Sequence, residues 1–158
     1  MKLLRRAFRP IIRPVLHCYF RFARPLTLGA FGMVIDGTGR VFLIKHSYLD
    51  GWHLPGGGVE PGESVHSALA RELAEEGNIA LNAPAVLKSM HFNRRSSRRD
   101  HVGFYLIEQF SQTAPKQPDH EIAESGFFPL DRLPRDTTPA TLRRIAEIFQ
   151  DEPASPYW

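Results

Sequence analysis

The sequence has little cysteine, no long apolar run and no internal repeat, and each absence excludes a class of protein. Cys18 is the one cysteine among 158 residues, so no disulfide can form within the chain. This is typical of a reducing cytoplasm, which we expect as the location, although a cysteine-poor secreted protein would look the same. No apolar run approaches the roughly 20 residues that span a bilayer. The hydrophobic fraction of 42% and the charged fraction of 23% indicate one ordinary globular domain.

Acidic residues are absent from residues 1–24, which hold seven lysines and arginines. The rest of the chain has 13 basic and 17 acidic residues, a balance of −4, so the high isoelectric point belongs to the N-terminal segment. Arginines interrupt its apolar residues and no small-residue cleavage site follows, which argues against a secretory signal. We expect residues 1–26 to form short helical pieces, because Pro10, Pro14 and Pro25 interrupt them.

Two roles are open for this basic segment. It could be an amphipathic element that rests on an anionic membrane or on RNA. Alternatively, it could dock on its own domain or on the second subunit of a homodimer and leave its arginines in water. We favour the docked arrangement, because charge patterns without a motif are weak indicators of function.

Apolar periodicity predicts the elements of the remaining chain. We expect strands at residues 27–36, 40–48, 85–92, 101–110 and 126–130, with the first two joined in a β-hairpin by a glycine-rich turn. Helices are expected at residues 64–76 and 138–151, the second with Leu142, Ile145, Ile148 and Phe149 facing inward. This mixture predicts an α/β fold, a mixed sheet covered by helices, in one domain over residues 27–152 with a loose tail at residues 153–158.

Three glutamates crowd the end of the first of these helices. Glu72, Glu75 and Glu76 have the i, i+3 and i+4 spacing that shares one helical face. Like charges so placed repel one another unless a cation lies among them, and oxygen ligands suit Mg²⁺ or Mn²⁺. A solvated helical face would show the same residues. Because Mg²⁺ commonly bridges protein carboxylates and substrate phosphates, the metal reading favours diphosphate chemistry.

The segment Gly57–Ile79, GGVEPGESVHSALARELAEEGNI, resembles the Nudix box, G-x5-E-x7-R-E-U-x-E-E-x-G-U, in which U is aliphatic. Asn78 replaces the last glycine of the box, but asparagine also tolerates the left-handed conformation that ends helices, so we expect the loop to keep its path. The stretches WHLPGGG and ESGFFPLDRLP also look like Nudix domains, and the resemblance covers residues 27–150. The matching positions are Gly57, Glu63, Arg71, Glu72, Leu73, Glu75, Glu76 and Ile79.

The resemblance implies an α/β/α sandwich around a mixed sheet and a hydrolase that cuts the diphosphate of a nucleoside diphosphate linked to another group. It implies a metal-binding set with Mg²⁺, or alternatively Mn²⁺, held by Glu72, Glu75 and Glu76 with the carbonyl of Gly56 assisting. Glu63 and Arg71 would be the pair that orients the loop and the helix.

The general base is left open by the resemblance. Glu72 is one candidate, and the family sometimes uses a carboxylate from a loop outside the box. Glu121 and Glu124 precede the late strand where such a residue is found. We favour Glu121 as a further metal ligand or as the base, against the alternative of a solvated loop charge.

Residues outside the box would recognise the rest of the substrate, and they leave its identity open. ADP-ribose, a sugar nucleotide and an oxidised nucleoside triphosphate are the candidates. Side chains that could contact substrate are Arg40, Lys45, His46, Trp52 and Phe92, together with the backbone of Gly57. For both aromatic residues, a place in the core is the favoured alternative. The arginines at 94, 95, 98 and 99 could hold phosphates, but a solvated hairpin tip is favoured.

Two further functions stay open. A Nudix-like domain can be catalytically weak and sense a nucleotide, although such domains usually lose the box carboxylates that this chain keeps. An RNA-directed pyrophosphohydrolase would use the basic N-terminal segment and the arginine-rich turn to grip RNA.

Overall fold

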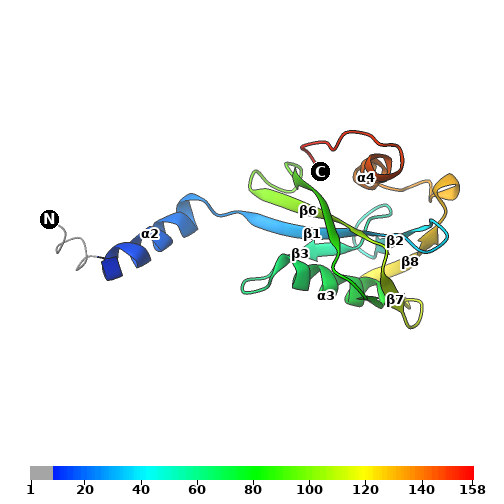
Figure 1. Cartoon of the computed structure of the whole chain (residues 1–158), viewed down its shortest axis with the longest axis horizontal. Coiled ribbons are helices and arrows are strands. Elements are labelled where there is room, and N and C mark those ends of the chain that lie inside the picture. Colours follow the sequence, from blue (N-terminus) through cyan, green and yellow to red (C-terminus); the bar gives the residue numbers. More distant parts are fainter. Residues whose placement is uncertain (1–8) are drawn as a thin grey trace.

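The computed structural model of the chain describes residues 9–158, without the side chains of residues 9–13, Val15 and His17. Predictions that concern residues 1–8 lie outside the described residues. The described chain forms a folded domain from which one helix projects (Figure 1).

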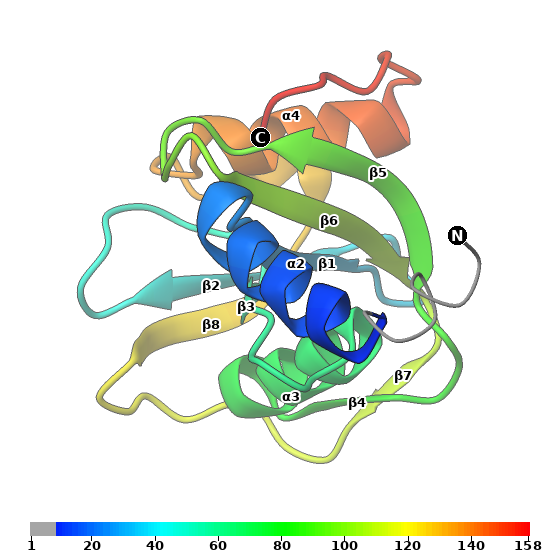
Figure 2. The same ribbon diagram turned by 90° about the vertical axis from the view of Figure 1, so that its left-hand side faces the viewer.

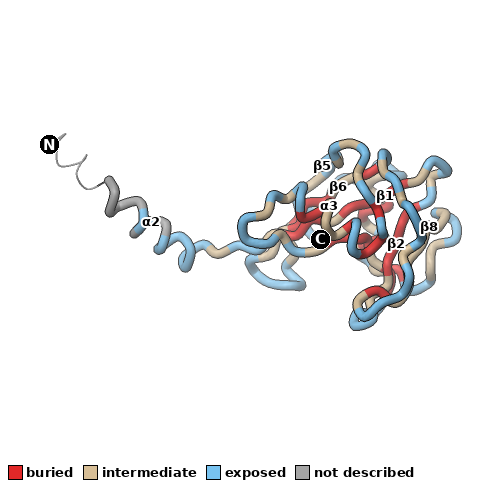
Figure 3. Tube along the Cα trace, turned by 90° about the horizontal axis from the view of Figure 1, so that it is seen from below, coloured by how far each residue is buried: buried red, intermediate tan, exposed pale blue. Residues whose placement is uncertain are grey.

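That helix, α2 (Arg9–Ala23), is continuous and stands clear of the domain in two perpendicular views (Figures 1 and 3). The prediction of short helical pieces is therefore wrong. Pro10 lies in the first turn, where its missing N–H has no intrahelical acceptor, and Pro14 removes a single hydrogen bond from the helix. The favoured expectation of a helix docked on its own domain is also not met. Within residues 9–158, no helix combines the length and apolar character needed to cross a bilayer.

The main sheet brings together segments that are distant in the sequence. Its order is β3 (Gly56–Gly58), β1 (Thr27–Val34), β6 (Asp100–Ile107) and β5 (Val86–Phe92). Strands β1 and β6 run parallel, and the other two contacts are antiparallel. The short glycine strand β3 thus lies at one edge, directly before the helix that carries the box glutamates.

Two strand pairs complete the fold: β2 (Val41–His46) with β8 (Ile122–Phe128), and β4 (Ile79–Leu81) with β7 (Phe110–Gln112). The predicted hairpin of the first two strands is corrected, because β1 and β2 meet only at an isolated bridge between Ile35 and Val41. Beyond the turn they diverge, and each finds a partner from later in the chain. All four residues from Val41 to Ile44 are buried, as expected for a strand covered on both faces.

Helices cover both sides of the sheet, which confirms the α/β/α sandwich (Figure 2). Helix α3 (Val65–Gly77) packs Leu69 and Leu73 into one hydrophobic cluster, and α4 (Pro139–Phe149) contributes to another on the opposite side, after the short helix η1 (Leu130–Arg132). The inward face of α4 was only partly predicted: Ile145 is buried and Ile148 is partly buried, whereas Leu142 and Phe149 are exposed.

Helix α3 begins and ends at residues that favour helix caps. Ser64 caps the helix, since its hydroxyl accepts a hydrogen bond from the N–H of Ser67 at 3.1 Å. Asn78 ends it in the left-handed conformation, with φ 52° and ψ 33°, as expected for the residue that replaces the last box glycine. The helix that carries the glutamates is therefore held in register at both ends.

The tail at residues 153–158 differs from the loose segment that we expected. The N–H of Phe92 donates to the carbonyl of Pro156 at 2.8 Å, and the N–H of Trp158 donates to the carbonyl of Phe92 at 3.2 Å. The tail is thus joined to the last residue of β5 by an isolated bridge between Phe92 and Tyr157. A carboxylate of Glu147, paired with the buried Arg144, also accepts a hydrogen bond from the N–H of Ser155 at 2.9 Å.

Candidate active site

A cleft of about 380 Å³ opens where the glycine strand β3 meets helix α3. Residues from five separate parts of the chain line it, so the fold assembles it from distant segments. The lining residues that carry the argument below are Phe31, His46, Glu72, Glu76, Glu121 and Trp158, with the glycines of β3.

Arg71 fastens the loop to the helix beside this cleft. Its guanidinium donates to both carboxylate oxygens of Glu63, at 3.0 and 3.2 Å, and to Oε1 of Glu72 at 2.8 Å. It also donates to the carbonyl of Gly58 at 3.1 Å. The hydrogen bonds from Arg71 lower the pKa of Glu63 and keep that side chain ionised. Arg71 therefore lies between Glu63 and Glu72, while its role in orienting the loop and the helix stays a prediction.

The glycines of β3 allow the carboxylates to approach the backbone. A Cβ at position 57 would lie 2.5 Å from Oε1 of Glu72, so any other residue there would displace that carboxylate. Gly56 has φ 137°, a conformation that side chains rarely adopt, and its N–H donates to Oε2 of Glu76 at 2.6 Å. Glycine is thus needed twice, once for close approach and once for backbone conformation.

Glu76 is the deepest carboxylate of the cleft, with 3% of its surface exposed. Burial raises its pKa to about 8, and the nearby carboxylates of Glu72 and Glu121 act in the same direction, whereas the hydrogen bond from Gly56 opposes them. Burial likewise raises the pKa of Glu72, despite its contact with Arg71. Gathering these carboxylates in one cleft is therefore unfavourable unless a proton or a cation neutralises part of their charge.

The donor atoms around Glu76 fit a small divalent cation. His46, Glu76 and Glu121 each offer a ligand atom, and these three atoms lie within 4.8 Å of one another. Burial lowers the pKa of His46, which favours the neutral ring, and its Nδ1 is buried without a hydrogen-bond partner. A set dominated by carboxylate oxygens suits Mg²⁺ or Mn²⁺. From the sequence, His46 was expected only as a possible contact with substrate.

The two loop carboxylates are placed differently. Glu121 lines the cleft and accepts a hydrogen bond from the hydroxyl of Tyr48 at 3.3 Å. Glu124 instead lies 3.7 Å from the ammonium of Lys45. The preference for Glu121 thus agrees with its position, although its role stays a prediction. Glu75, the third box glutamate, is mostly exposed and accepts a hydrogen bond from Arg71 at 3.2 Å.

Three residues considered as substrate contacts do not line the cleft. Trp52 is buried in the core against Phe128, with the ring centroids 4.8 Å apart. Arg40 pairs with Asp36 across the turn that follows β1. Lys45 is next to His46 on β2, and successive side chains of a strand point to opposite faces, so it faces away from the cleft. Gly57 does line the cleft, and its contact with a substrate stays a prediction.

Two aromatic residues that sequence reasoning missed form a wall of the cleft. The rings of Phe31 and Trp158 lie with centroids 5.2 Å apart, and the guanidinium of Arg144 lies 5.2 Å from the Trp158 ring. The available signal was the aromatic pair Tyr157–Trp158 at the end of a segment that otherwise has the composition of a loose tail. A flat aromatic surface near the carboxylates offers a place for a nucleobase.

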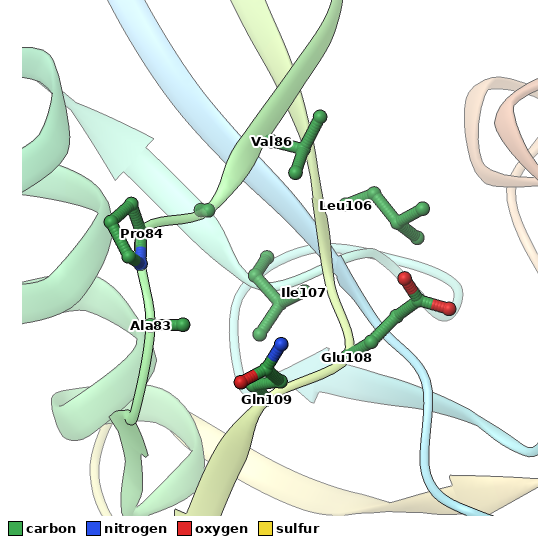
Figure 4. A pocket seen from close by; sticks show the side chains of 8 residues that line it. Ala83, Pro84, Val86, Leu106, Ile107, Glu108 and Gln109 are labelled. Atoms are coloured by element: carbon green, nitrogen blue, oxygen red, sulfur yellow. The ribbon is translucent and has the colours of Figure 1, made fainter.

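Two other hollows differ in their relation to the cleft. One of about 620 Å³ shares Phe31, Gly57 and Gly58 with it and reaches Asn93, so the space next to the carboxylates is large enough for a nucleotide. The other is about 60 Å³ and lies between the loop before β5 and the end of β6, with Ile107 and Gln109 at its centre (Figure 4). It is too small for such a ligand.

Comparison with known proteins places these residues in a family. The model of the NUDIX domain matches residues 25–148. A Bacillus subtilis (strain 168) protein named "Putative 8-oxo-dGTP diphosphatase" is 44% identical over 59 residues, which are 36% of this chain and 40% of that protein. A Mycobacterium tuberculosis (strain CDC 1551 / Oshkosh) protein named "Putative mutator protein MutT4" is 34% identical over 134 residues, 77% of this chain and 54% of that protein.

A solved structure agrees. The MutT NUDIX hydrolase from Burkholderia pseudomallei is 33% identical, with a TM-score of 0.63 over 76% of this chain and 94% of that chain. The matches to the two sequence relatives span 40% and 54% of those proteins' lengths. Since the family model covers well over half of the sequence and the fold agrees, the chain belongs to the Nudix family.

Proposed function

We propose that this protein is a divalent-metal-dependent pyrophosphohydrolase that cleaves the diphosphate linkage of a nucleoside diphosphate derivative. The observation that carries the proposal is the convergence of Glu72, Glu76 and Glu121 on one cleft beside the glycines of β3. An oxidised nucleoside triphosphate is the first substrate to test, because the relative from Bacillus subtilis has the name "Putative 8-oxo-dGTP diphosphatase". ADP-ribose and sugar nucleotides are the next candidates.

Different residues of the cleft would bind the metal, position the carboxylates and bind the nucleobase. Glu72 and Glu76 would hold Mg²⁺ or Mn²⁺, with the carbonyl of Gly56 assisting. When bound, such an ion neutralises phosphate oxygens and makes a water molecule more acidic. Arg71 is a positioning residue, since it holds Glu72 and Glu63 in place. Phe31 and Trp158 would bind the base.

Glu121 is the better placed general base. Glu72 already accepts a charge-assisted hydrogen bond from Arg71 at 2.8 Å, which weakens it as a proton acceptor. Glu121 accepts only the long hydrogen bond from Tyr48 among the contacts of its side chain in the described chain. It therefore keeps lone pairs available for a proton from water.

The test is a substrate panel with a matched pair of variants. The wild-type protein is assayed with 8-oxo-dGTP, dGTP, ADP-ribose and a UDP-sugar, in Mg²⁺ or Mn²⁺, and the nucleotide and phosphate products are separated. Glu121→Gln should reduce turnover by about 10²-fold or more, whereas Glu124→Gln, three residues later and turned toward Lys45, should retain it. If the protein binds metal but forms no product from any of these substrates, the result would favour a nucleotide sensor over an enzyme.

A further inference from the structure

Helix α2 presents a broad apolar face to solvent. At about 100° per residue, Leu16, Tyr19, Phe20 and Ala23 share one side of the helix. All four are exposed, and 62% of Tyr19 and 45% of Phe20 are accessible. Phe22, with 73% exposed, widens this face. A soluble domain normally covers such a surface, so something outside the described chain is needed to cover it.

Arg21 is exposed on the opposite side of α2. Arg24 follows the last residue of the helix and is also exposed, with its guanidinium 5.6 Å from the ring of Phe20. No acidic residue occurs in residues 1–24, although seven are basic. A basic face beside an aromatic and aliphatic face is the composition of helices that lie in the interface of a membrane.

A second basic element lies near the C-terminal end of α2. Strand β1 begins at Thr27, whose N–H donates to the carbonyl of Arg99 at 3.0 Å and whose hydroxyl donates to Asp100 at 2.7 Å. These bonds fix the start of β1 beside the loop between β5 and β6, and Figure 2 shows this loop next to the end of α2. Exposed arginines occupy four positions of the loop, Arg94, Arg95, Arg98 and Arg99. One end of the molecule thus carries two basic elements and an apolar helical face.

We propose that α2 lies in the headgroup region of a membrane that contains anionic lipids, with the arginine-rich loop against the same surface. The apolar face of α2 would enter the acyl boundary, and the arginines would pair with lipid phosphates. This site is independent of the catalytic cleft and of the proposed reaction.

Two other occupants fit the same surface less well. A second copy of the chain would bring two sets of seven basic residues together without an acidic partner on the helices, which is repulsive. RNA would pair with the arginines and could stack on Tyr19 or Phe20, but the aliphatic Leu16 and Leu26 offer nothing to a base. An anionic lipid surface satisfies both the charge and the apolar face.

Vesicle sedimentation of the full chain tests the apolar face. We expect binding to vesicles of phosphatidylcholine with phosphatidylglycerol, and little binding to phosphatidylcholine alone. Phe20→Asp should weaken this binding about tenfold or more, because it removes an aromatic side chain that would enter the acyl boundary and adds a negative charge that the anionic lipids repel. Leu142→Asp is the matched control, since Leu142 is also 45% exposed on a helix, and it should bind like the wild type.

A second pair of variants tests the charge. Each arginine near an anionic surface contributes about fivefold to binding, so Arg21→Gln with Arg24→Gln should lose about 25-fold. The control replaces Arg132 and Arg135, which are exposed after β8, and should change little. Added salt should weaken binding of the wild type more than that of the Arg21/Arg24 variant.

Cys18 provides a direct readout, because it is exposed on α2 and is the one cysteine of the sequence. A polarity-sensitive fluorophore on Cys18 should shift to the blue with anionic vesicles and not with phosphatidylcholine. The proposal fails if the wild type does not bind anionic vesicles at low salt, or if Phe20→Asp binds as well as the wild type. It also fails if light scattering shows a dimer that Phe20→Asp dissociates, or if single-stranded RNA binds in preference to the vesicles.

Discussion

Replacing Glu76 by glutamine should stabilise the metal-free protein while it abolishes activity. Glu76 is 3% exposed, and its pKa is raised from 4.5 to about 8, first by burial and then by Glu72 and Glu121. In the unfolded chain this carboxyl ionises near its ordinary value, so the unfolded state releases the proton at lower pH than the folded state does. The contribution of Glu76 to the free energy of unfolding is therefore most favourable below about pH 4.5 and is lost as pH rises to about 8.

The magnitude follows from the size of the shift. At 1.36 kcal/mol for each unit of pKa, ionising Glu76 in the folded protein costs about 5 kcal/mol above pH 8. Glutamine has nearly the same shape, carries no charge and keeps an oxygen to accept the N–H of Gly56. In a protein of this size, each kcal/mol corresponds to about 2–4 °C in Tm, so the variant should melt about 10–20 °C higher at alkaline pH.

The assay compares thermal unfolding of wild type and Glu76→Gln after removal of metal, between pH 5 and pH 9. The two melting curves should nearly coincide at pH 5 and separate as pH rises. Glu75→Gln is the matched control, because Glu75 is exposed on the same helix, and its difference from wild type should not grow with pH in this way. Added Mg²⁺ should stabilise the wild type more than Glu76→Gln, and turnover of the variant should fall by orders of magnitude. A wild-type minus variant difference that is constant from pH 5 to pH 9 would show that Glu76 ionises normally.

Three further outcomes are expected. Gly57→Ala should lower metal affinity, measured by calorimetry, and turnover, measured by kinetics, because its Cβ would displace the carboxylate of Glu72. Gly58→Ala should leave both quantities unchanged, since its Cβ would meet nothing within 4 Å. Burial alone would raise the pKa of Asp36, but the hydrogen bonds of its turn lower this pKa to about 2. The contribution of Asp36 to stability is therefore present above pH 3.8 and is lost as pH falls toward 2. Asp36→Asn should remove that part of the acid-induced loss of stability, measured by urea unfolding at successive pH values. Trp158→Ala should raise KM for nucleotide substrates more than it lowers kcat, with Trp158→Phe restoring most of the affinity; an unchanged KM for Trp158→Ala would remove the base-binding role.

The parts of the site that lie close together in the sequence were predictable. The spacing of Glu72 and Glu76, the salt bridge of Arg71 with Glu63 and the left-handed Asn78 all depend on one loop and one helix. Helical periodicity and capping preferences determine such local geometry, whatever the rest of the chain does. The α/β/α sandwich followed from the mixture of elements and from the resemblance to the family.

Residues whose placement depends on distant partners were not predictable in this way. Trp52 and Trp158 are both aromatic residues in glycine- or proline-rich surroundings. Trp52 is in the core because α4 and β8 cover it, and Trp158 is in the cleft because its segment pairs with β5. Local sequence contains neither fact, because both result from contacts between residues far apart in the chain.

The position of Glu121 shows how a single irregularity determines the site. In the β2–β8 pair, Lys45 is opposite Glu124, but His46 is opposite Ile122, so a bulge at Ala123 shifts the register by one residue. Beyond the bulge, the N–H of Ser47 donates to the carbonyl of Glu121 at 2.8 Å. A regular ladder would have placed Glu121 opposite Tyr48, one residue further along the chain after β2. The bulge thus separates Glu121, which lines the cleft, from Glu124, which pairs with Lys45.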